Sequence, residues 1–135
     1  MTWLLDGNVI VALAWSGHPF HGRASHWLRT LPAGDMIATC PITEGTLLRI
    51  HMQHGFDRSS EAAWAALRAI HSHPRHVFWA EAFSYTEIAP TRLTAHRQVT
   101  DAWLAELARR KGAKLATLDE ALFVLWPEST FLIPV

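Results

Sequence analysis

Four carboxylates, spread over nearly the whole chain, are the side chains best placed to do chemistry: Asp6, Glu44, Asp101 and Asp119. Asp6 and Asp119 stand close behind apolar, strand-like segments, whereas Glu44 and Asp101 stand near the starts of expected helices. A carboxylate beside a buried segment needs a partner. In an open parallel sheet, the edge where strands give way to helices is also where ligands bind. We therefore expect the four acids to meet in one cation-binding pocket.

The chemistry of such a pocket follows from its oxygen ligands. Mg2+ and Mn2+ prefer carboxylate oxygens, whereas zinc sites usually contain Cys or His. Ions of this kind lower the pKa of an attacking water and neutralise charge during phosphodiester hydrolysis. The alternative is that each acid is a helix N-terminal residue favoured by the macrodipole. That explanation suffices for any single acid, but it is weak for four acids that all adjoin apolar segments.

The elements that would position these acids alternate between strands and helices. Short strands are predicted at residues 2–6, 36–40, 76–79, 114–117 and 131–133. Helices are predicted at 8–15, 20–31, 41–52, from 59–61 onward, at 99–111 and at 121–125, with a short helix and a loop in 83–97. This alternation predicts an α/β protein, a three-layer α/β/α domain with a mostly parallel sheet of about five strands. No linker or repeat interrupts residues 1–135, so a single domain is expected.

Composition narrows the class of protein. Half of the 135 residues are hydrophobic, and twelve basic residues balance twelve acidic ones. A net charge of zero does not favour non-specific nucleic-acid binding through bulk charge. Basic residues do gather on both sides of Asp101, so a pocket neutralised by metal would leave a basic surface compatible with a phosphodiester substrate.

The expected location is the cytoplasm. No apolar run approaches the roughly 18–20 residues that span a bilayer, so no membrane association is expected. Asp6 interrupts the N-terminal apolar stretch, which argues against a signal peptide. The lone Cys40 cannot form an internal disulfide, which favours a reducing compartment.

The four acidic segments together resemble the motifs of PIN-domain proteins. Their sequences are Leu4–Val9, Ile42–Glu44, Thr100–Leu104 and Ala116–Asp119. Within PIN domains, residues 96–119 look most like those of VapC toxins. The resemblance implies a PIN-like fold and a Mg2+-dependent endoribonuclease, with Mn2+ as a possible substitute. It also implies the toxin of a type II toxin–antitoxin pair, inhibited by a VapB-type antitoxin and usually a homodimer, with higher hetero-oligomers possible.

The resemblance also assigns roles to the acids. Asp6 and Asp101 would be direct metal ligands, and Glu44 would bind or orient a metal-bound water. Asp119 would complete the cluster and help to hold a second ion, if one binds.

Three neighbouring residues carry smaller expectations. Asn8 would support Asp6 or a water, although it is also a good helix cap. Thr117 would supply a hydroxyl beside Asp119, although a strand Thr needs no function. Gly7 departs from the family, which usually has Thr or Ser there; a backbone N–H is expected to replace part of that contact.

Some features have more ordinary explanations. The histidines of segment 71–76 suggest zinc, but no Cys pair or His-Glu-x-x-His spacing supports it, so a solvated helix end is preferred. Trp27, Trp64 and Trp103 lie on apolar helix faces and are predicted to be core residues rather than stacking platforms for RNA.

Surface residues are the least constrained. Arg49, Arg92 and Arg97 fit RNA contacts and simple surface solubility equally well. The helix at 20–31 and the helix at 41–52 have apolar faces that would form a groove for an antitoxin helix.

Two other functions stay open at this stage. The first is a PIN-type nuclease that acts in RNA maturation or on DNA without a toxin role. The second is a catalytically idle module that binds RNA or protein, against which the intact set of four acids argues.

Overall fold

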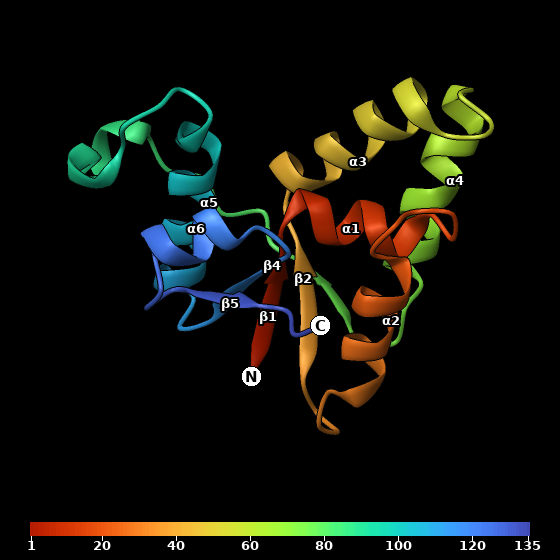
Figure 1. The fold of residues 1–135 in the computed structure, drawn as a ribbon, viewed down its shortest axis with the longest axis horizontal. Helices are drawn as coiled ribbons and strands as arrows, with labels where there is room; N and C mark the ends of the chain where they lie inside the picture. Colours follow the sequence, from red (N-terminus) through yellow and green to blue (C-terminus); the bar gives the residue numbers. More distant parts are fainter.

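A five-stranded parallel sheet forms the centre of the protein in a computed structural model that describes residues 1–135 (Figure 1). The strands are β1 (Thr2–Leu5), β2 (Met36–Thr39), β3 (His76–Phe78), β4 (Lys114–Thr117) and β5 (Thr130–Leu132). Their order is β3-β2-β1-β4-β5, and every neighbouring pair is parallel. The carboxyl ends of all five strands therefore share one edge, with β1 in the middle.

Six α-helices cover the two faces of this sheet. They are α1 (Gly7–Ala14), α2 (His21–Thr30), α3 (Pro41–His54), α4 (Ser60–His71), α5 (Gln98–Arg110) and α6 (Glu120–Leu125). Helices α1 to α4 lie on one side of the sheet, and α5 and α6 lie on the other (Figure 1). The predicted three-layer α/β fold is confirmed, and the sheet is entirely parallel.

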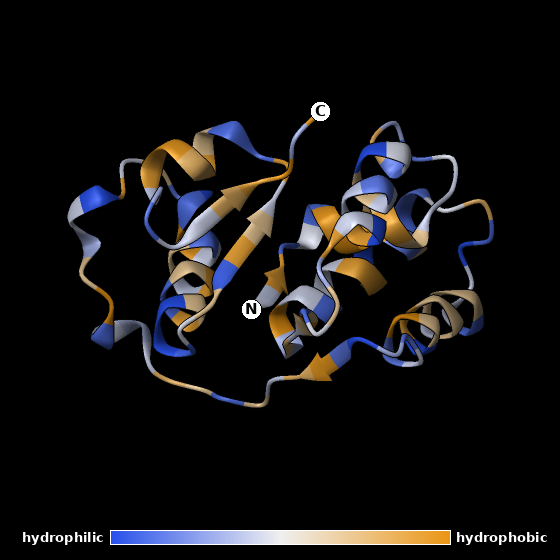
Figure 2. Ribbon diagram, turned by 90° about the horizontal axis from the view of Figure 1, so that it is seen from below, coloured by the Kyte–Doolittle hydropathy of each residue, from blue (hydrophilic) through white to orange (hydrophobic).

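The alternation of side chains along each strand produces two separate cores. Leu5 points into the cluster beneath α1 and α2, whereas Leu4 points into the cluster beneath α5. The same division separates Ile37 from Ala38 on β2. Successive strand residues face opposite sides of a sheet, so a strand covered on both faces must be apolar throughout. Figure 2 shows mainly apolar colouring on the strands, with hydrophilic residues at the starts of β3 and β4, and a mixed pattern along the amphipathic helices.

Residues 79–97 form a long connection between β3 and α5 (Figure 2). The short helix predicted there is two 3-10 turns, Tyr85–Glu87 and Pro90–Arg92. The connection is fixed to α5 by Phe83, whose ring stacks on Trp103 with centroids 4.7 Å apart. The Trp103 indole N–H also donates to the Phe83 carbonyl at 3.1 Å.

One tryptophan was wrongly predicted as a core residue. Trp27 and Trp103 are each 5% exposed, as expected, but Trp64 is 45% exposed. Helix α4 buries Ala63 and packs mainly on α3 and β3, so Trp64 faces outward beside Glu61 and Arg68. Helical periodicity identifies an apolar face but not whether another element covers it. No helix in the chain combines the length and the apolar character needed to cross a membrane.

Candidate active site

Asp6 lies at the end of the central strand and begins the site. Its carboxylate caps α1, because Oδ1 accepts a hydrogen bond from the Gly7 backbone N–H at 2.7 Å. Its second oxygen, Oδ2, accepts from the Thr117 hydroxyl at 2.7 Å. Asp6 is only 8% exposed, and this burial raises its pKa despite the two hydrogen bonds, which lower it. Burial disfavours the charged form of a carboxyl group unless an opposite charge compensates.

Thr117 and Asn8 join β1 to β4 at this edge. The Thr117 oxygen accepts from the Asp119 backbone N–H at 3.0 Å and from the Asn8 side-chain amide at 3.4 Å. The Asn8 carbonyl oxygen accepts from the Leu118 N–H at 3.3 Å. Thr117 lies beside Asp119, as predicted, and contacts Asp6 as well. Asn8 contacts Thr117 and Leu118, and its predicted support of Asp6 or a water stays a prediction.

Asp119 follows β4 and caps the short helix α6. Its Oδ1 accepts from the backbone N–H groups of Ala121 at 2.9 Å and Leu122 at 3.3 Å. A capping carboxylate is favoured at a helix N-terminus because it satisfies otherwise unpaired N–H groups. The cap uses one carboxylate oxygen and holds the whole side chain at the carboxyl edge of the sheet.

Asp101 approaches from the opposite layer, in the first turn of α5. Its pKa is raised to about 6, mainly by burial and then by the charges of Asp6 and Asp119. Like charges that cannot move apart disfavour one another's ionisation. The three aspartates are thus close enough to interact electrically. Asp101 and Asp119 also line a cavity of about 460 Å³ together with Arg97.

Glu44 has different neighbours from the three aspartates. It lies in the first turn of α3, and its Oε2 accepts from the Thr39 hydroxyl at 2.7 Å and from His71 Nε2 at 2.6 Å. The side chain is 15% exposed. Its charge acts on His76, whose pKa burial lowers, with His71 adding to that effect and Glu44 opposing it. Glu44 does not appear among the charges that raise the pKa of Asp6 or Asp101.

None of these contacts links Glu44 to the three aspartates. Its predicted role as the fourth acid of the site therefore stays a prediction. The two histidines beside it were not predicted as part of any site. A His-rich segment was visible in the sequence, but its proximity to Glu44 depends on how α4 and β3 pack against α3.

The glycine that departs from the family pattern has a steric explanation. A Cβ atom on Gly7 would lie 2.6 Å from Cγ2 of Thr46 on α3, which is closer than real side chains approach. Thr46 is held there by a hydrogen bond from its hydroxyl to the Ile42 carbonyl at 3.1 Å. The close contact between α1 and α3 therefore requires glycine at position 7. The Gly7 N–H donates to Asp6, but this bond does not depend on the side chain at position 7, so the replacement of the missing hydroxyl stays a prediction.

The three aspartates suit a hard divalent cation. All of the candidate ligand atoms are carboxylate oxygens, which Mg2+ and Mn2+ prefer. Burial first, and then the charges of Asp6 and Asp119, raise the pKa of Asp101, and a bound cation would offset both effects. The residues therefore fit a Mg2+ or Mn2+ site by charge and by ligand type.

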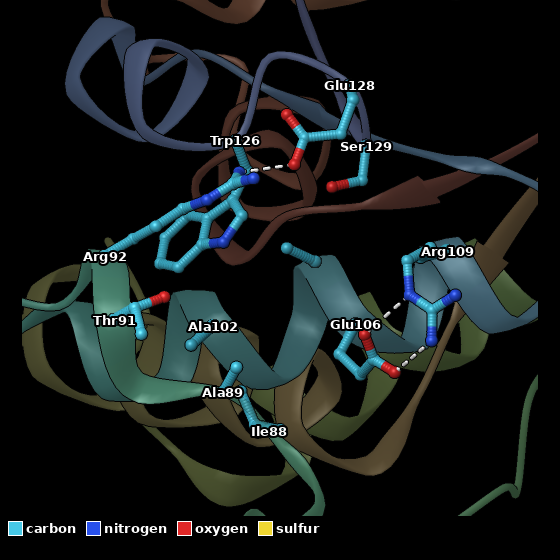
Figure 3. Close-up of a pocket in the computed structure, with 11 residues that line it drawn as sticks. Ile88, Ala89, Thr91, Arg92, Ala102, Glu106, Arg109, Trp126, Glu128 and Ser129 are labelled. Atoms are coloured by element: carbon cyan, nitrogen blue, oxygen red, sulfur yellow. Dashed lines mark hydrogen bonds and ion pairs between the residues drawn. The ribbon is translucent and has the colours of Figure 1, made fainter.

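A second cavity, of about 220 Å³, lies against another stripe of α5 (Figure 3). Its charged groups are already paired: Arg92 with Glu128, and Arg109 with Glu106 at 2.7 Å. Arg92 also donates to the Leu125 carbonyl at 3.1 Å. These pairs favour the surface explanation of Arg92 over an RNA contact, and they leave the cavity without an unpaired charge for a phosphate.

Comparison with known proteins gives consistent matches. The PIN domain profile matches residues 3–124. Ribonuclease VapC29 of Mycobacterium tuberculosis is 42% identical over 134 residues, covering 99% of this chain and 98% of the relative.

Two crystal structures share the fold. One is M. tuberculosis VapC20, a toxin that cleaves the sarcin-ricin loop, with a TM-score of 0.69, 20% identity, and coverage of 99% of this chain and 100% of the other. The second is VapBC2 from Rickettsia felis bound to a DNA fragment from their promoter, with a TM-score of 0.70, 19% identity, and coverage of 98% and 97%.

Proposed function

The chain belongs to the PIN-domain family of VapC ribonucleases, and from this we propose that it is a metal-dependent endoribonuclease that hydrolyses RNA phosphodiester bonds as the toxin of a type II toxin–antitoxin pair. The observation that carries the proposal is the Thr117 hydroxyl, which links Asp6 to the Asp119 backbone at the carboxyl edge of a parallel sheet. Asp101 lies near enough for both charges to add to the effect of burial in raising its pKa. Ligands bind at this edge in open α/β folds. The proposed enzyme is one nuclease domain that acts in the cytoplasm, in keeping with its single, unpaired Cys40.

In this proposal Asp6 and Asp101 hold the ion directly, and Asp119 completes the site. Glu44 contributes from α3 by orienting the attacking water. When bound, Mg2+ or Mn2+ supplies charge neutralisation at the phosphate and lowers the pKa of the attacking water. A cation site is supported by the burial of Asp101 beside the charges of Asp6 and Asp119, and the ligand type favours Mg2+ or Mn2+ over zinc.

The chain's own residues position the reaction. Thr117 and the Gly7 N–H fix both oxygens of Asp6, so this carboxylate is oriented before the ion or RNA arrives. Groups that are oriented in advance cost no reorganisation during the reaction. Arg97, in the same cavity as Asp101 and Asp119, is placed to bind a phosphate of the RNA backbone.

A VapB-type antitoxin is the proposed partner, and the toxin is proposed to be a homodimer. The antitoxin groove was predicted between α2 and α3.

An apolar cavity of about 200 Å³ lies instead between α1 and α3, lined by Val11, Trp15, Leu47 and Ile50. An amphipathic antitoxin helix binds such a surface through its apolar face. Co-expression with the adjacent small reading frame and co-purification tests the pairing, and the mass of the free and bound toxin tests the dimer.

The activity is tested by incubating the purified protein with structured RNA, with and without EDTA, and with Asp6→Asn and Asp101→Asn. We expect cleavage that requires Mg2+ or Mn2+ and is lost in both variants. Cleavage that survives chelation or either substitution would exclude the metal mechanism. RNA binding without cleavage at any metal concentration would identify an idle module. Cleavage without growth arrest on induction would identify a nuclease with no toxin role.

A further inference from the structure

Three ligand atoms outside the aspartate pocket converge on one point. One ligand atom from each of Glu44, His71 and His76 lies within 4.8 Å of the other two. They come from different elements, the first turn of α3, the last turn of α4 and the start of β3. The sequence predicts a solvated helix end for segment 71–76, whereas two of its histidines lie in one cluster with Glu44.

Hydrogen bonds hold this cluster together around the carboxylate. Glu44 Oε2 accepts from His71 Nε2 at 2.6 Å and from the Thr39 hydroxyl at 2.7 Å. His76 Nε2 lies 2.7 Å from the same Thr39 oxygen. The two imidazole rings are neighbours, with centroids 4.3 Å apart. Both Nε2 atoms are therefore directed at a region that holds one carboxylate oxygen and one hydroxyl.

We propose that Glu44, His71 and His76 bind a divalent transition-metal ion of the zinc class. Two imidazoles and one carboxylate form a ligand set of known zinc sites, in which water fills the open position. This set differs in kind from the all-carboxylate aspartate pocket, because imidazole nitrogen favours zinc-class ions over Mg2+. The sequence disfavoured zinc because the spacing of the residues within 71–76 fits no zinc motif. The third ligand is Glu44, which lies well before this segment in the chain.

The geometry needs only small adjustments to accept the ion. Tetrahedral zinc with bonds of 2.0–2.1 Å requires ligand atoms roughly 3.3 Å apart. The His71–Glu44 contact of 2.6 Å must open slightly, and the other two separations lie within 4.8 Å, so no ligand atom has to move far. The His71 side chain is 40% exposed, so an ion can reach the cluster from solvent.

Binding requires a particular tautomer of both histidines. Each Nε2 that now donates a hydrogen bond would lose its proton to solvent, and the neutral ring would carry one proton on Nδ1, which frees the Nε2 lone pair for the ion. The Thr39 hydroxyl can continue to donate to Glu44 Oε2. A hydrogen bond of this kind orients a metal-binding carboxylate and adds to the affinity of the site.

The site has a consequence that rests on the proposed function. Glu44 is shared between this cluster and the proposed nuclease mechanism. An ion that holds Glu44 against the two histidines withdraws it from the aspartate pocket. Zinc-class ions are therefore expected to reduce Mg2+-dependent RNA cleavage, and this reduction should disappear when His71 is replaced.

The binding itself is tested without RNA. Co2+ is titrated into metal-free protein in excess Mg2+, and the visible absorption is followed, with Zn2+ competition as confirmation. We expect one equivalent of Co2+ to bind and Zn2+ to displace it. His71→Ala and His76→Ala should each weaken binding by about 100-fold or more, since loss of an orienting outer contact alone typically costs 10–100-fold.

Two control variants make the result specific. His54→Ala removes an exposed histidine from the end of the same helix α3 and should leave Co2+ binding unchanged. Asp101→Asn should abolish RNA cleavage yet keep the Co2+ signal, which separates this site from the nuclease pocket. Absence of Co2+ binding in the unmodified protein, or binding that survives both histidine substitutions, would overturn the proposal. His71→Ala changes a partly exposed residue and is decisive even if His76→Ala fails to fold.

Discussion

The Thr117 hydroxyl donates a hydrogen bond to Asp6 Oδ2 at 2.7 Å, joining two residues that are 111 positions apart in the chain. Thr117 is fully buried, and its oxygen also accepts from the Asp119 backbone N–H. One hydroxyl on β4 thus connects the acids that follow β1 and β4. From the sequence alone a strand Thr needed no function, but this geometry gives it a positioning role in the proposed site.

Replacing Thr117 by Val keeps the shape of the side chain and removes this hydroxyl. A hydrogen bond to a charged group contributes about 1.5–3 kcal/mol, so its loss should raise the already raised pKa of Asp6 further. Protons then compete better with the cation, and the Mg2+ concentration for half-maximal cleavage should rise by roughly tenfold or more. Thr117→Ser, which keeps the hydroxyl, should restore the original Mg2+ dependence. An unchanged Mg2+ dependence in the Val variant would show that the hydroxyl does not tune the site.

The pKa of Asp101 predicts how stability depends on pH. Its value of about 6 lies above the ordinary 3.8, so the folded protein binds more protons than the unfolded chain between these values. This residue's contribution to stability is therefore full below about pH 4 and is lost as the pH rises through about 6. Asp101→Asn cannot ionise, and in EDTA it should unfold at a higher temperature than the unmodified protein near pH 7.5.

Thermal melts of both proteins across this pH range measure the effect. The difference in melting temperature in favour of Asp101→Asn should shrink as the pH falls toward 4. The contributions of the other titrating groups cancel when the two proteins are compared. Adding Mg2+ near pH 7.5 should raise the melting temperature of the unmodified protein more than that of Asp101→Asn. A difference in melting temperature that does not change with pH would contradict the raised pKa of Asp101.

The contact between Gly7 and Thr46 predicts a cost for restoring a side chain at position 7. Gly7→Ala places a Cβ 2.6 Å from Thr46 Cγ2, in a buried contact between α1 and α3. Overpacking of this kind typically costs about 1–3 kcal/mol of unfolding free energy. Thr46→Ala removes the obstructing methyl group and should recover part of the loss in the double variant. Denaturant unfolding of the two single variants and the double variant measures the coupling, and purely additive effects would exclude a steric origin.

The fold was largely predictable from the sequence because its strands are short, apolar and separated by amphipathic helices. The predicted strand at 114–117 is observed unchanged, and the helix predicted from Val99 begins one residue earlier. The contacts of Glu44 were not predictable. They depend on the packing of α4 and β3 beside α3, which local periodicity does not encode. The outward side chain of Trp64 escaped prediction for the same reason, since nothing local shows which apolar face stays uncovered.

Asp119 has two separable roles, a helix cap and a charge in the proposed site. Asn is also a good N-cap, so Asp119→Asn should keep the hydrogen bonds to the first turn of α6 and lose only the charge. Asp119→Ala loses both roles and should cost about 1 kcal/mol of stability in addition. RNA cleavage should fall to a similar extent in both variants, while only the Ala variant should unfold at a lower denaturant concentration. If the Asn variant cleaved RNA normally, Asp119 would be a cap alone, and the cation would be held without its charge.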